Sequence, residues 1–283
     1  MPAKIIDGKK LSEEILLDVK RQVAELKAGG IMPCLAVLLA GSNASSSLYV
    51  KKKQESCDFC GIESRLSLFN EGVSEKEMLE QIAKLNADEN VHGILVQLPL
   101  PKQIDAEKVI DSVLSEKDVD GFSAENIGKL ALGNEELASC TPKGIIKLIE
   151  STGVNIEGKN CCVVNHSVVV GKPMALLLLN RNATVTVCHK FTKNLNAETK
   201  RADILISAVG KKGLIGKEAI KKGAVVIDAG IFIDGEKTFG DVNFAEAKKI
   251  ASFITPVPGG VGPMTVACLM ENTVIACKKQ SGR

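Results

Sequence analysis

The sequence predicts an α/β fold with two domains, each built from parallel strands that alternate with helices. Short apolar runs such as Leu35–Leu39 and Gly93–Val96 are typical of strands that are buried on both faces of a parallel sheet. Helical patterns and polar loops separate these runs along the whole chain, which indicates repeated β-α units. A length of 283 residues is enough for two hydrophobic cores.

The first half predicts one α/β domain. Ser74 occupies an N-cap position, and Glu77 stands where a capping box places an acid, so a helix is expected from there to about residue 85. Charge, glycine and the loss of periodicity at Lys117–Gly121 indicate a hinge or inter-domain loop. We therefore predict a first domain of residues 1–121. The expected strands are residues 35–39, 64–68 and 93–96, with a further helix after the first of them that ends near residue 60.

The second half predicts a doubly wound domain of residues 122–264, because its strands and helices alternate at the spacing of that fold. Its first helix is expected to begin at Thr141-Pro142, since proline is favoured at the first helical position. The expected strands are residues 161–164, 184–187, 203–207 and 224–228; the remaining expected helices are 171–180 and, after Pro263, residues 265 to about 279.

Composition narrows the class of protein. A net charge of +2 gives no reason to expect a nucleic-acid partner, and the lysine doublets are scattered without interleaved aromatic residues. No apolar run reaches the ~20 residues that a membrane helix needs, and residues 1–10 do not resemble a signal peptide. Nine cysteines, an odd number, favour reduced thiols and a cytoplasmic location. Cys57-x-x-Cys60 stands alone, so buried inert thiols are favoured over a metal site, and no metal is expected.

The segment Tyr49-Val50-Lys51-Lys52-Lys53 holds the only tyrosine and the best candidate for a catalytic base. Tyr49 and Lys53 are four residues apart, so they share one face of a helix, whereas Lys51 and Lys52 point elsewhere. A lysine beside a phenol can hold or pass a proton. Most helical lysines are solvated surface residues, so the pair alone is weak evidence.

The turn after strand 161–164 is a candidate cofactor site. The pattern here is a strand, a turn and a helix that begins near Gly171. This arrangement is typical of a site that binds a phosphate at a helix N-terminus, although the sequence is not G-x-G-x-x-G. Asn165 occupies the tight-turn position, where asparagine tolerates a left-handed φ, and His166 and Ser167 follow it. On spacing alone, a dinucleotide site is only slightly favoured over a structural turn.

Lys190 lies just after the next expected strand, about where an NAD-preferring fold places an acid for the ribose 2′-hydroxyl. A cation there suits a 2′-phosphate, so NADP is favoured over NAD; the alternative is a surface lysine. Two later strands end in Ser207-Ala-Val-Gly210 and Asp228-Ala-Gly230-Ile231, and ligands bind at the carboxyl ends of such strands. Ser207, Gly210 and Ile231 are therefore further cofactor candidates.

Residues Thr255–Thr265, here called the glycine-proline loop, contain three prolines and three glycines, among them Gly259 and Gly260. Such a rigid loop can present backbone amides to a flat ligand, or it can be a mere crossover of the chain. Gln97 directly follows the expected strand 93–96, and Asp120 lies in the expected hinge at residues 117–121. The spacing of these two residues alone does not require a catalytic role for either.

Together these segments resemble the bifunctional methylenetetrahydrofolate dehydrogenase/cyclohydrolase family over nearly the full length, from Ile6-Asp7-Gly8 to the final helix. The residues that carry the resemblance are Tyr49-x-x-x-Lys53, Gly93-Ile-Leu-Val-Gln97-Leu-Pro-Leu-Pro101, Lys117-Asp-Val-Asp-Gly-Phe122, Cys140-Thr-Pro-Lys-Gly144, Ser167-x-x-x-Gly171-x-Pro173-Met174, Ile206-Ser-Ala-Val-Gly210 and Pro258-Gly-Gly-Val-Gly-Pro-Met-Thr265.

The resemblance implies oxidation of 5,10-methylenetetrahydrofolate with NADP, or sometimes NAD, and hydrolysis of the methenyl product to 10-formyltetrahydrofolate. It implies a cleft between an N-terminal folate domain and a C-terminal Rossmann-type domain, with the last helix, 265–283, packed back on the first domain. A cytoplasmic homodimer and a contribution to purine biosynthesis are also expected. Lys53 matches the catalytic lysine, Tyr49 and Gln97 its supporting residues, Asp120 the carboxylate that holds the pterin, and Pro258, Gly259 and Gly260 the loop over folate.

One departure from the family pattern concerns the cofactor turn, which usually begins Gly-Arg-Ser or Gly-Ala-Ser. Here it reads Asn165-His166-Ser167, and a histidine is mostly neutral at pH 7. A cyclohydrolase with weak or lost dehydrogenase activity is therefore an alternative. A folate-binding protein without turnover is a further one, against which Tyr49, Lys53 and the other matching residues argue. Without the resemblance, the sequence leaves a generic NADP oxidoreductase.

Overall fold

The computed structural model describes residues 2–235 and 237–282. The chain forms two compact units. One, here the six-strand unit, comprises the chain up to Ser12 together with residues 141–265. The other, here the three-strand unit, comprises residues 13–140 and the chain from Val266 onward.

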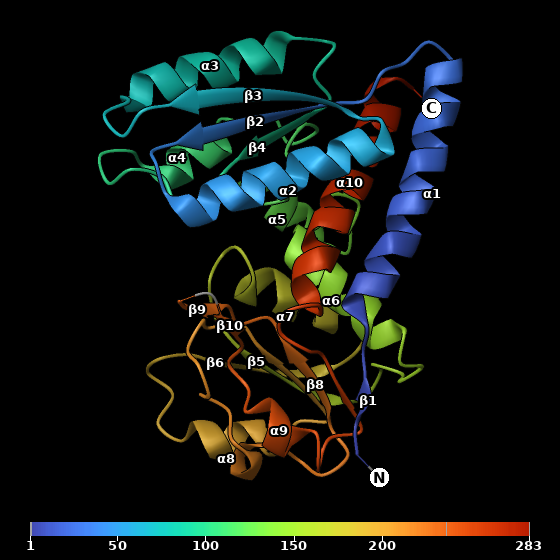
Figure 1. The fold of residues 1–283 in the computed structure, drawn as a ribbon, viewed down its shortest axis with the longest axis vertical. Helices are drawn as coiled ribbons and strands as arrows, with labels where there is room; N and C mark the ends of the chain where they lie inside the picture. The colour runs from blue at the N-terminus through green and yellow to red at the C-terminus, as the bar shows by residue number, and fades with distance from the viewer. Residues whose placement is uncertain (1, 236, 283) are drawn as a thin grey trace. The chain divides into compact units, whose positions relative to one another are not determined.

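The three-strand unit is a parallel sheet in the order β3 (Glu63–Phe69), β2 (Cys34–Ala40), β4 (Gly93–Val96). Figure 1 shows helix α3 (Glu75–Ala87) on one face of this sheet and α2 (Ala44–Cys60) on the other. Alternate residues of β2 serve the two faces: Leu35 packs in the cluster that contains α2, and Leu38 in the cluster that contains α3. The unit also holds α4 (Ala106–Asp111), α5 (Ala124–Ala131) and most of α1 (Gly8–Ala28).

Local sequence signals set the helix ends. Asn43 caps α2, because its side chain accepts a hydrogen bond from the Ser46 amide, and Gly61 ends the helix with a φ of 78°. The capping box of Ser74 and Glu77 is confirmed at the start of α3. These caps set the ends of the two helices, buried apolar residues pack both against the sheet, and α2 carries the Tyr49–Lys53 pair.

The six-strand unit is a parallel sheet with small helices and a hairpin, and the prediction of a Rossmann-type, doubly wound unit is confirmed. Its strand order is β1 (Lys4–Ile5), β11 (Phe253–Ile254), β8 (Val225–Asp228), β7 (Ile204–Ser207), β5 (Asn160–Val164), β6 (Thr184–Cys188). Its other elements are α6 (Cys140–Glu150, from Thr141 onward), α7 (Gly171–Leu179), α8 (Leu195–Thr199), a 3-10 turn Lys217–Ala219, α9 (Phe244–Ala247) and the hairpin β9 (Phe232–Asp234) and β10 (Lys237–Phe239).

Strand β5 lies at the topological switch point of this sheet. The chain leaves β5 for β6 on one side and later returns to β7 on the other side. Loops after β5 and β7 therefore run in opposite directions, which leaves room at the carboxyl ends of the two strands. Every strand expected from the sequence is present, within one residue of its expected bounds at each end.

Two expectations about segment ends differ from the structure. Helix α10 (Val261–Gln280) begins four residues before the expected start at residue 265, because Pro263 falls in its first turn, where a missing N–H removes no intrahelical bond. Residues 117–121 lie inside the three-strand unit, which runs on to Cys140. The reason is that Leu137 and Cys140 pack in the same core as Val119.

Candidate functional site

Lys53 and Gln97 form a direct polar contact at the carboxyl end of the three-stranded sheet. Lys53 is 8% exposed, and its Nζ donates a hydrogen bond to Gln97 Oε1 at 3.0 Å. Gln97 follows β4 directly, and its Nε2 donates to the Leu98 carbonyl at 2.9 Å. That second bond fixes the orientation of the amide, so the oxygen faces the lysine.

Tyr49 lies one helical turn before Lys53, as the spacing predicts. Its side chain is half-buried, and burial raises the pKa of the phenol above its ordinary value. Lys51 and Lys52 are exposed, so the prediction that they point away from Lys53 is confirmed. The Lys52 Nζ lies 6.0 Å from the centre of the Tyr49 ring. Tyr49 is therefore a neutral aromatic surface beside a buried amine.

Asp120 completes the group. Burial raises the pKa of its carboxyl, and the positive charge of Lys53 acts in the opposite direction. Helix α2, the end of β4 and the loop after residue 117 thus supply one buried amine, one amide and one carboxyl that influence one another. Such a set can accept and return a proton beside a bound substrate.

Asp118 holds the loop that carries Asp120, and sequence reasoning missed it. Its buried carboxylate accepts hydrogen bonds from the amides of Gly121, at 3.0 Å, and Ser123, at 2.9 Å. It also accepts one from the Asn126 side chain at 2.9 Å. These three hydrogen bonds to one carboxylate hold the loop that carries Asp120 against the start of α5. The only sequence signal is the acid two residues before Asp120.

Asn272 on α10 supports the same loop from a distant part of the chain. Its fully buried side-chain amide donates to the Val119 carbonyl at 2.9 Å and to the Ala138 carbonyl at 3.0 Å. The thiol of Cys140, two residues after Ala138, also donates to the Val119 carbonyl, at 3.2 Å. No local pattern could have identified Asn272, because its partner Val119 is 153 residues away in sequence.

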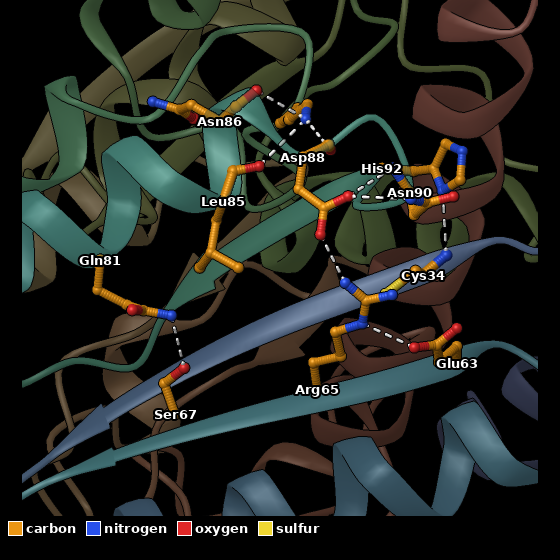
Figure 2. A network of polar contacts seen from close by, with 11 residues as sticks. Cys34, Glu63, Arg65, Ser67, Gln81, Leu85, Asn86, Asp88, Asn90 and His92 are labelled. Carbon is orange, nitrogen blue, oxygen red and sulfur yellow. Dashed lines mark hydrogen bonds and ion pairs between the residues drawn. The ribbon is translucent and has the colours of Figure 1, made fainter.

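A second polar network occupies the amino ends of β2 and β4, opposite to Gln97 (Figure 2). Arg65 pairs there with Asp88 at 2.7 Å. The buried His92 ring accepts a hydrogen bond from the Cys34 amide at 3.2 Å. Burial, and the nearby charge of Lys117, lower the pKa of His92. This network braces the sheet and lies at the other end of the strands from the catalytic candidates.

In the six-strand unit, the turn after β5 holds the candidate residues Asn165, His166, Ser167 and Gly171. Asn165 does not adopt a left-handed backbone; within residues 2–235 and 237–282, Asn182 is the one non-glycine residue with a positive φ. The expectation of a left-handed Asn165 is thus wrong. Its side chain instead accepts hydrogen bonds from the amides of Ser167, at 2.7 Å, and Gly171, at 3.1 Å.

His166 and Lys190 lie in the loops that follow the neighbouring strands β5 and β6, and both are exposed. The ring of His166 is 4.9 Å from that of His189, and the Lys190 Nζ is 4.9 Å from the centre of the Phe191 ring. Two imidazoles, an ammonium and an aromatic ring therefore form an exposed cluster that can receive an anionic, aromatic ligand. His189 and Phe191 were not singled out by sequence reasoning.

Asp241 fixes the loop after β7, where Ser207 and Gly210 lie, and sequence reasoning missed it too. Its fully buried carboxylate accepts hydrogen bonds from the Ser207 hydroxyl, at 2.7 Å, and from the Gly210 amide, at 2.8 Å. Gly210 has a φ of 80°, which explains the need for glycine. Neighbouring Asp228 accepts three backbone amides, yet burial raises its pKa to about 6.

The residues present fit a dinucleotide, because exposed His166 and Lys190 follow neighbouring strands at the carboxyl edge of the sheet, where glycines let the turns pack closely. A Cβ on Gly171 would come within 2.2 Å of the Asn165 carbonyl oxygen. One on Gly230 would come within 2.1 Å of Asp241 Oδ1. Ile231, which follows, is exposed. Gly171 and Gly230 therefore allow the turns to pack closely at the carboxyl ends of β5 and β8, the edge at which ligands bind in such sheets.

The glycine-proline loop lies in the six-strand unit. Pro258 is exposed, Gly259 has a φ of 104°, and the Gly259 carbonyl accepts a hydrogen bond from the Lys9 amide at 3.0 Å. Gly260 approaches Gly8 so closely that a Cβ on Gly8 would come within 2.0 Å of the Gly260 oxygen. The loop is therefore held by backbone contacts with the start of α1.

The cysteine side chains are all buried, and that of Cys140 bonds to the Asp120 loop as described above. None of the nine cysteines forms a disulfide; burial raises the pKa of Cys57 to about 12 and that of Cys60 to about 11, as is typical of inert thiols. Across residues 2–235 and 237–282, no cluster of three or more histidine, cysteine or acidic side chains is arranged to hold a metal ion. In the same part of the chain, no helix is long and apolar enough to cross a membrane.

A doubly wound nucleotide-binding unit, together with a buried amine, amide and carboxyl in a second α/β unit, defines a cofactor-dependent enzyme of the dehydrogenase class. Residues 6–120 match the family model of the tetrahydrofolate dehydrogenase/cyclohydrolase catalytic domain. Residues 139–281 match that of the NAD(P)-binding domain of the same family. The chain belongs to the tetrahydrofolate dehydrogenase/cyclohydrolase family, as the motifs predicted.

Individual relatives agree over the full length. The chain is 51% identical over 280 residues to the bifunctional protein FolD of Moorella thermoacetica. The aligned residues cover 99% of this chain and 100% of the relative. A crystal structure of the bifunctional FolD of Campylobacter jejuni superposes with a TM-score of 0.96 at 46% identity, covering 98% of this chain and 99% of that one. The structure of the Trypanosoma brucei enzyme, solved with NADP and an inhibitor, superposes with a TM-score of 0.96 at 35% identity. The match covers 100% of this chain and 99% of that one.

Proposed function

We propose that this protein oxidises 5,10-methylenetetrahydrofolate with NADP and then hydrolyses 5,10-methenyltetrahydrofolate to 10-formyltetrahydrofolate. The observation that carries the proposal is the nearly buried Lys53 amine, held at 3.0 Å by Gln97 and influenced by Asp120. These are the residues that match the family motifs. The relatives named above are bifunctional, and they give no support to the alternative of a lost dehydrogenase.

In the hydrolytic step, water attacks the cationic amidine carbon of the methenyl compound, and the ring then opens to the formyl product. In its neutral form, the Lys53 amine accepts the proton that leaves the attacking water, because an acid–base group must lie within hydrogen-bond reach of that water. It then returns a proton to the ring nitrogen whose bond to the one-carbon unit breaks, while the hydroxyl proton of the adduct leaves as the formyl C=O forms. Gln97 steers the amine through its oxygen. Tyr49 stacks on the folate, and Asp120 holds the pterin through hydrogen bonds that its carboxyl can both donate and accept when protonated.

In the oxidative step, NADP supplies the hydride acceptor when it is bound. The chain contributes binding and orientation through the loops at the carboxyl ends of its strands, with no acid or base required. We assign this role to His166, Ser167, Gly171, Lys190, Ser207, Gly210 and Ile231, and we place Asn165 at the same site, where its side chain holds the turn after β5. The assignment of Pro258, Gly259 and Gly260 to folate binding stays a prediction from the family motif.

One experiment tests the function. The purified protein is incubated with methylenetetrahydrofolate and NADP or NAD while reduced nicotinamide is followed, and the loss of methenyltetrahydrofolate is followed in parallel without nucleotide. Formation of NADPH and nucleotide-independent loss of the methenyl compound are both expected. Methenyl loss alone would leave only the cyclohydrolase, and folate binding without turnover would refute both activities.

We further propose that the protein works in the cytoplasm as a homodimer and supplies formyl groups for purine biosynthesis. Nine cysteines, none of them in a disulfide, favour a reducing compartment. Strand β3 is the edge of its sheet and leaves Leu68 68% exposed, which favours a partner surface. Light scattering coupled to size-exclusion chromatography is expected to give twice the chain mass of 30.1 kDa; a monomer at micromolar concentration would contradict the dimer.

A further inference from the structure

Asn165 bridges the switch point of the six-stranded sheet with its side-chain amide. It is the first residue after β5. Its Nδ2 donates to the carbonyl of Ala208, which follows β7, the strand on the other side of the switch point. Its Oδ1 accepts the amides of Ser167 and Gly171. These partners define the amide orientation, because a carbonyl only accepts and a backbone N–H only donates.

The two amides that Asn165 Oδ1 accepts belong to the turn that opens α7. In a doubly wound nucleotide-binding unit, the amides of this turn are the donors that face the pyrophosphate of the cofactor. The Ser167 hydroxyl takes a further amide of the turn, that of Val170, at 3.1 Å. The side chains of the turn thus already use the hydrogen bonds that a phosphate oxygen would receive.

We propose that Asn165 competes with the pyrophosphate of NADP for these two amides and so sets the affinity of the protein for the nucleotide. The inference rests on the proposed use of NADP and deepens it. Asn165 Oδ1 is a neutral acceptor, whereas a phosphate oxygen is charged and forms the stronger bond to the same N–H groups. The nucleotide therefore displaces the amide, but it binds less tightly than it would to donors that are free.

The expected effect is about tenfold in the dissociation constant, equivalent to about 1.4 kcal/mol. This free energy is about that of the two neutral hydrogen bonds from the Ser167 and Gly171 amides to Asn165 Oδ1. Both bonds must break before NADP can form its own bonds to these amides. Because Asn165 has no positive φ, other side chains fit its backbone without strain, and glycine fits as well. The position can therefore be varied without backbone strain, and the glycine and aspartate variants both lose the bond to the Ala208 carbonyl.

The test compares Asn165→Gly and Asn165→Asp with the wild type and with the matched control Asn155→Gly. Asn155 Oδ1 also accepts an amide two residues ahead, that of Glu157, at 3.2 Å, but it precedes the amino end of β5. Isothermal titration of the full-length protein with NADP, and separately with ADP, gives the dissociation constants. Thermal unfolding of each variant is recorded in the same buffer.

Asn165→Gly is expected to bind both nucleotides about tenfold more tightly. Asn165→Asp is expected to bind them at least about tenfold more weakly, because its carboxylate holds the two amides more strongly and repels the pyrophosphate. Asn155→Gly is expected to bind as the wild type does. Unchanged or weaker binding by Asn165→Gly with an unfolding temperature like that of the control overturns the proposal.

A readout on the wild type covers the case in which a variant fails to fold. Saturation with NADP is expected to shift the NMR signals of the Asn165 side-chain amide and of the Ser167 and Gly171 amides, as the intramolecular bonds break. An Asn165 side-chain signal that is unmoved at saturation overturns the competition but leaves NADP use intact. Failure of every variant and of the wild type to bind any nucleotide overturns both the competition and the proposed dehydrogenase activity.

Discussion

Replacement of Lys53 by methionine is the sharpest test of the catalytic assignment. The change removes the amine and its hydrogen bond to Gln97 Oε1 but keeps a long apolar side chain in a position that is 8% exposed. Loss of a positioned acid–base group lowers a rate about 10²–10⁴-fold, which is roughly 3–5 kcal/mol of barrier at 1.36 kcal/mol per tenfold. Methenyl hydrolysis is expected to fall by that factor.

The stability of Lys53→Met is expected to stay within about 2 kcal/mol of the wild type. The lost hydrogen bond to a charged donor is worth about 1.5–3 kcal/mol, and removal of a nearly buried charge offsets part of it. NADPH formation is expected to fall less than about tenfold, because hydride transfer depends on geometry.

The assay follows methenyl absorbance and NADPH separately, with urea unfolding of each protein and Lys51→Met as the control, since Lys51 is exposed on the same helix. Lys51→Met should behave as the wild type in both reactions. Hydrolysis by a folded Lys53→Met within about tenfold of the wild type would refute the role of this amine. Equal loss of both activities would instead indicate that Lys53 serves substrate binding.

Three further outcomes are expected. Lys190→Ala should raise the Michaelis constant for NADP and leave that for NAD unchanged, with exposed Lys193→Ala as the control; an equal rise for both nucleotides would exclude a 2′-phosphate contact. His92 has a lowered pKa, so the unfolded chain binds its proton more tightly and stability is lost as the pH falls below about 6.5. In urea unfolding between pH 7 and 5, His92→Asn should lose less stability than the wild type, and an equal loss would contradict the role of His92 in this pH dependence. Asp120 has a raised pKa from burial, so its ionisation disfavours the folded state as the pH rises through the folded pKa. Asp120→Asn should therefore be more stable than the wild type at pH 7, lose that advantage at acid pH, and bind folate more weakly in a direct titration.

The strands and the main helices could be predicted because their signals are local. Buried β-branched runs and a capping box report burial and hydrogen bonding within a few residues, as at Ser74 and Glu77. The relation of Tyr49 to Lys53 follows from the helical repeat alone. Helix α1 was not predicted, although Ile15, Val19 and Val23 recur at helical spacing and pack in a core.

The turn at Asn165 shows why residue type and position do not settle a role. The sequence suggested a backbone effect, a tolerated left-handed φ, whereas the structure shows a side-chain effect at ordinary φ. The partners that decide this role are Gly171, six residues on, and the Ala208 carbonyl, 43 residues away. Such contacts depend on the strand order, which brings β5 beside β7, and strand order has no local signal.

The frame of the Asp120 loop is the part of the candidate site that sequence reasoning could least supply. Asp118 uses its carboxylate to accept amides and an amide side chain, and Asn272 supplies donors to two buried carbonyls from the far end of the chain. Removal of either would leave buried polar groups without partners, each at about 1–3 kcal/mol. The precision of Asp120 beside Lys53 therefore depends on residues that themselves contact no reacting atom. A catalytic motif in the sequence therefore identifies the chemical groups of the site, whereas their relative positions depend on long-range hydrogen bonds such as those of Asn272.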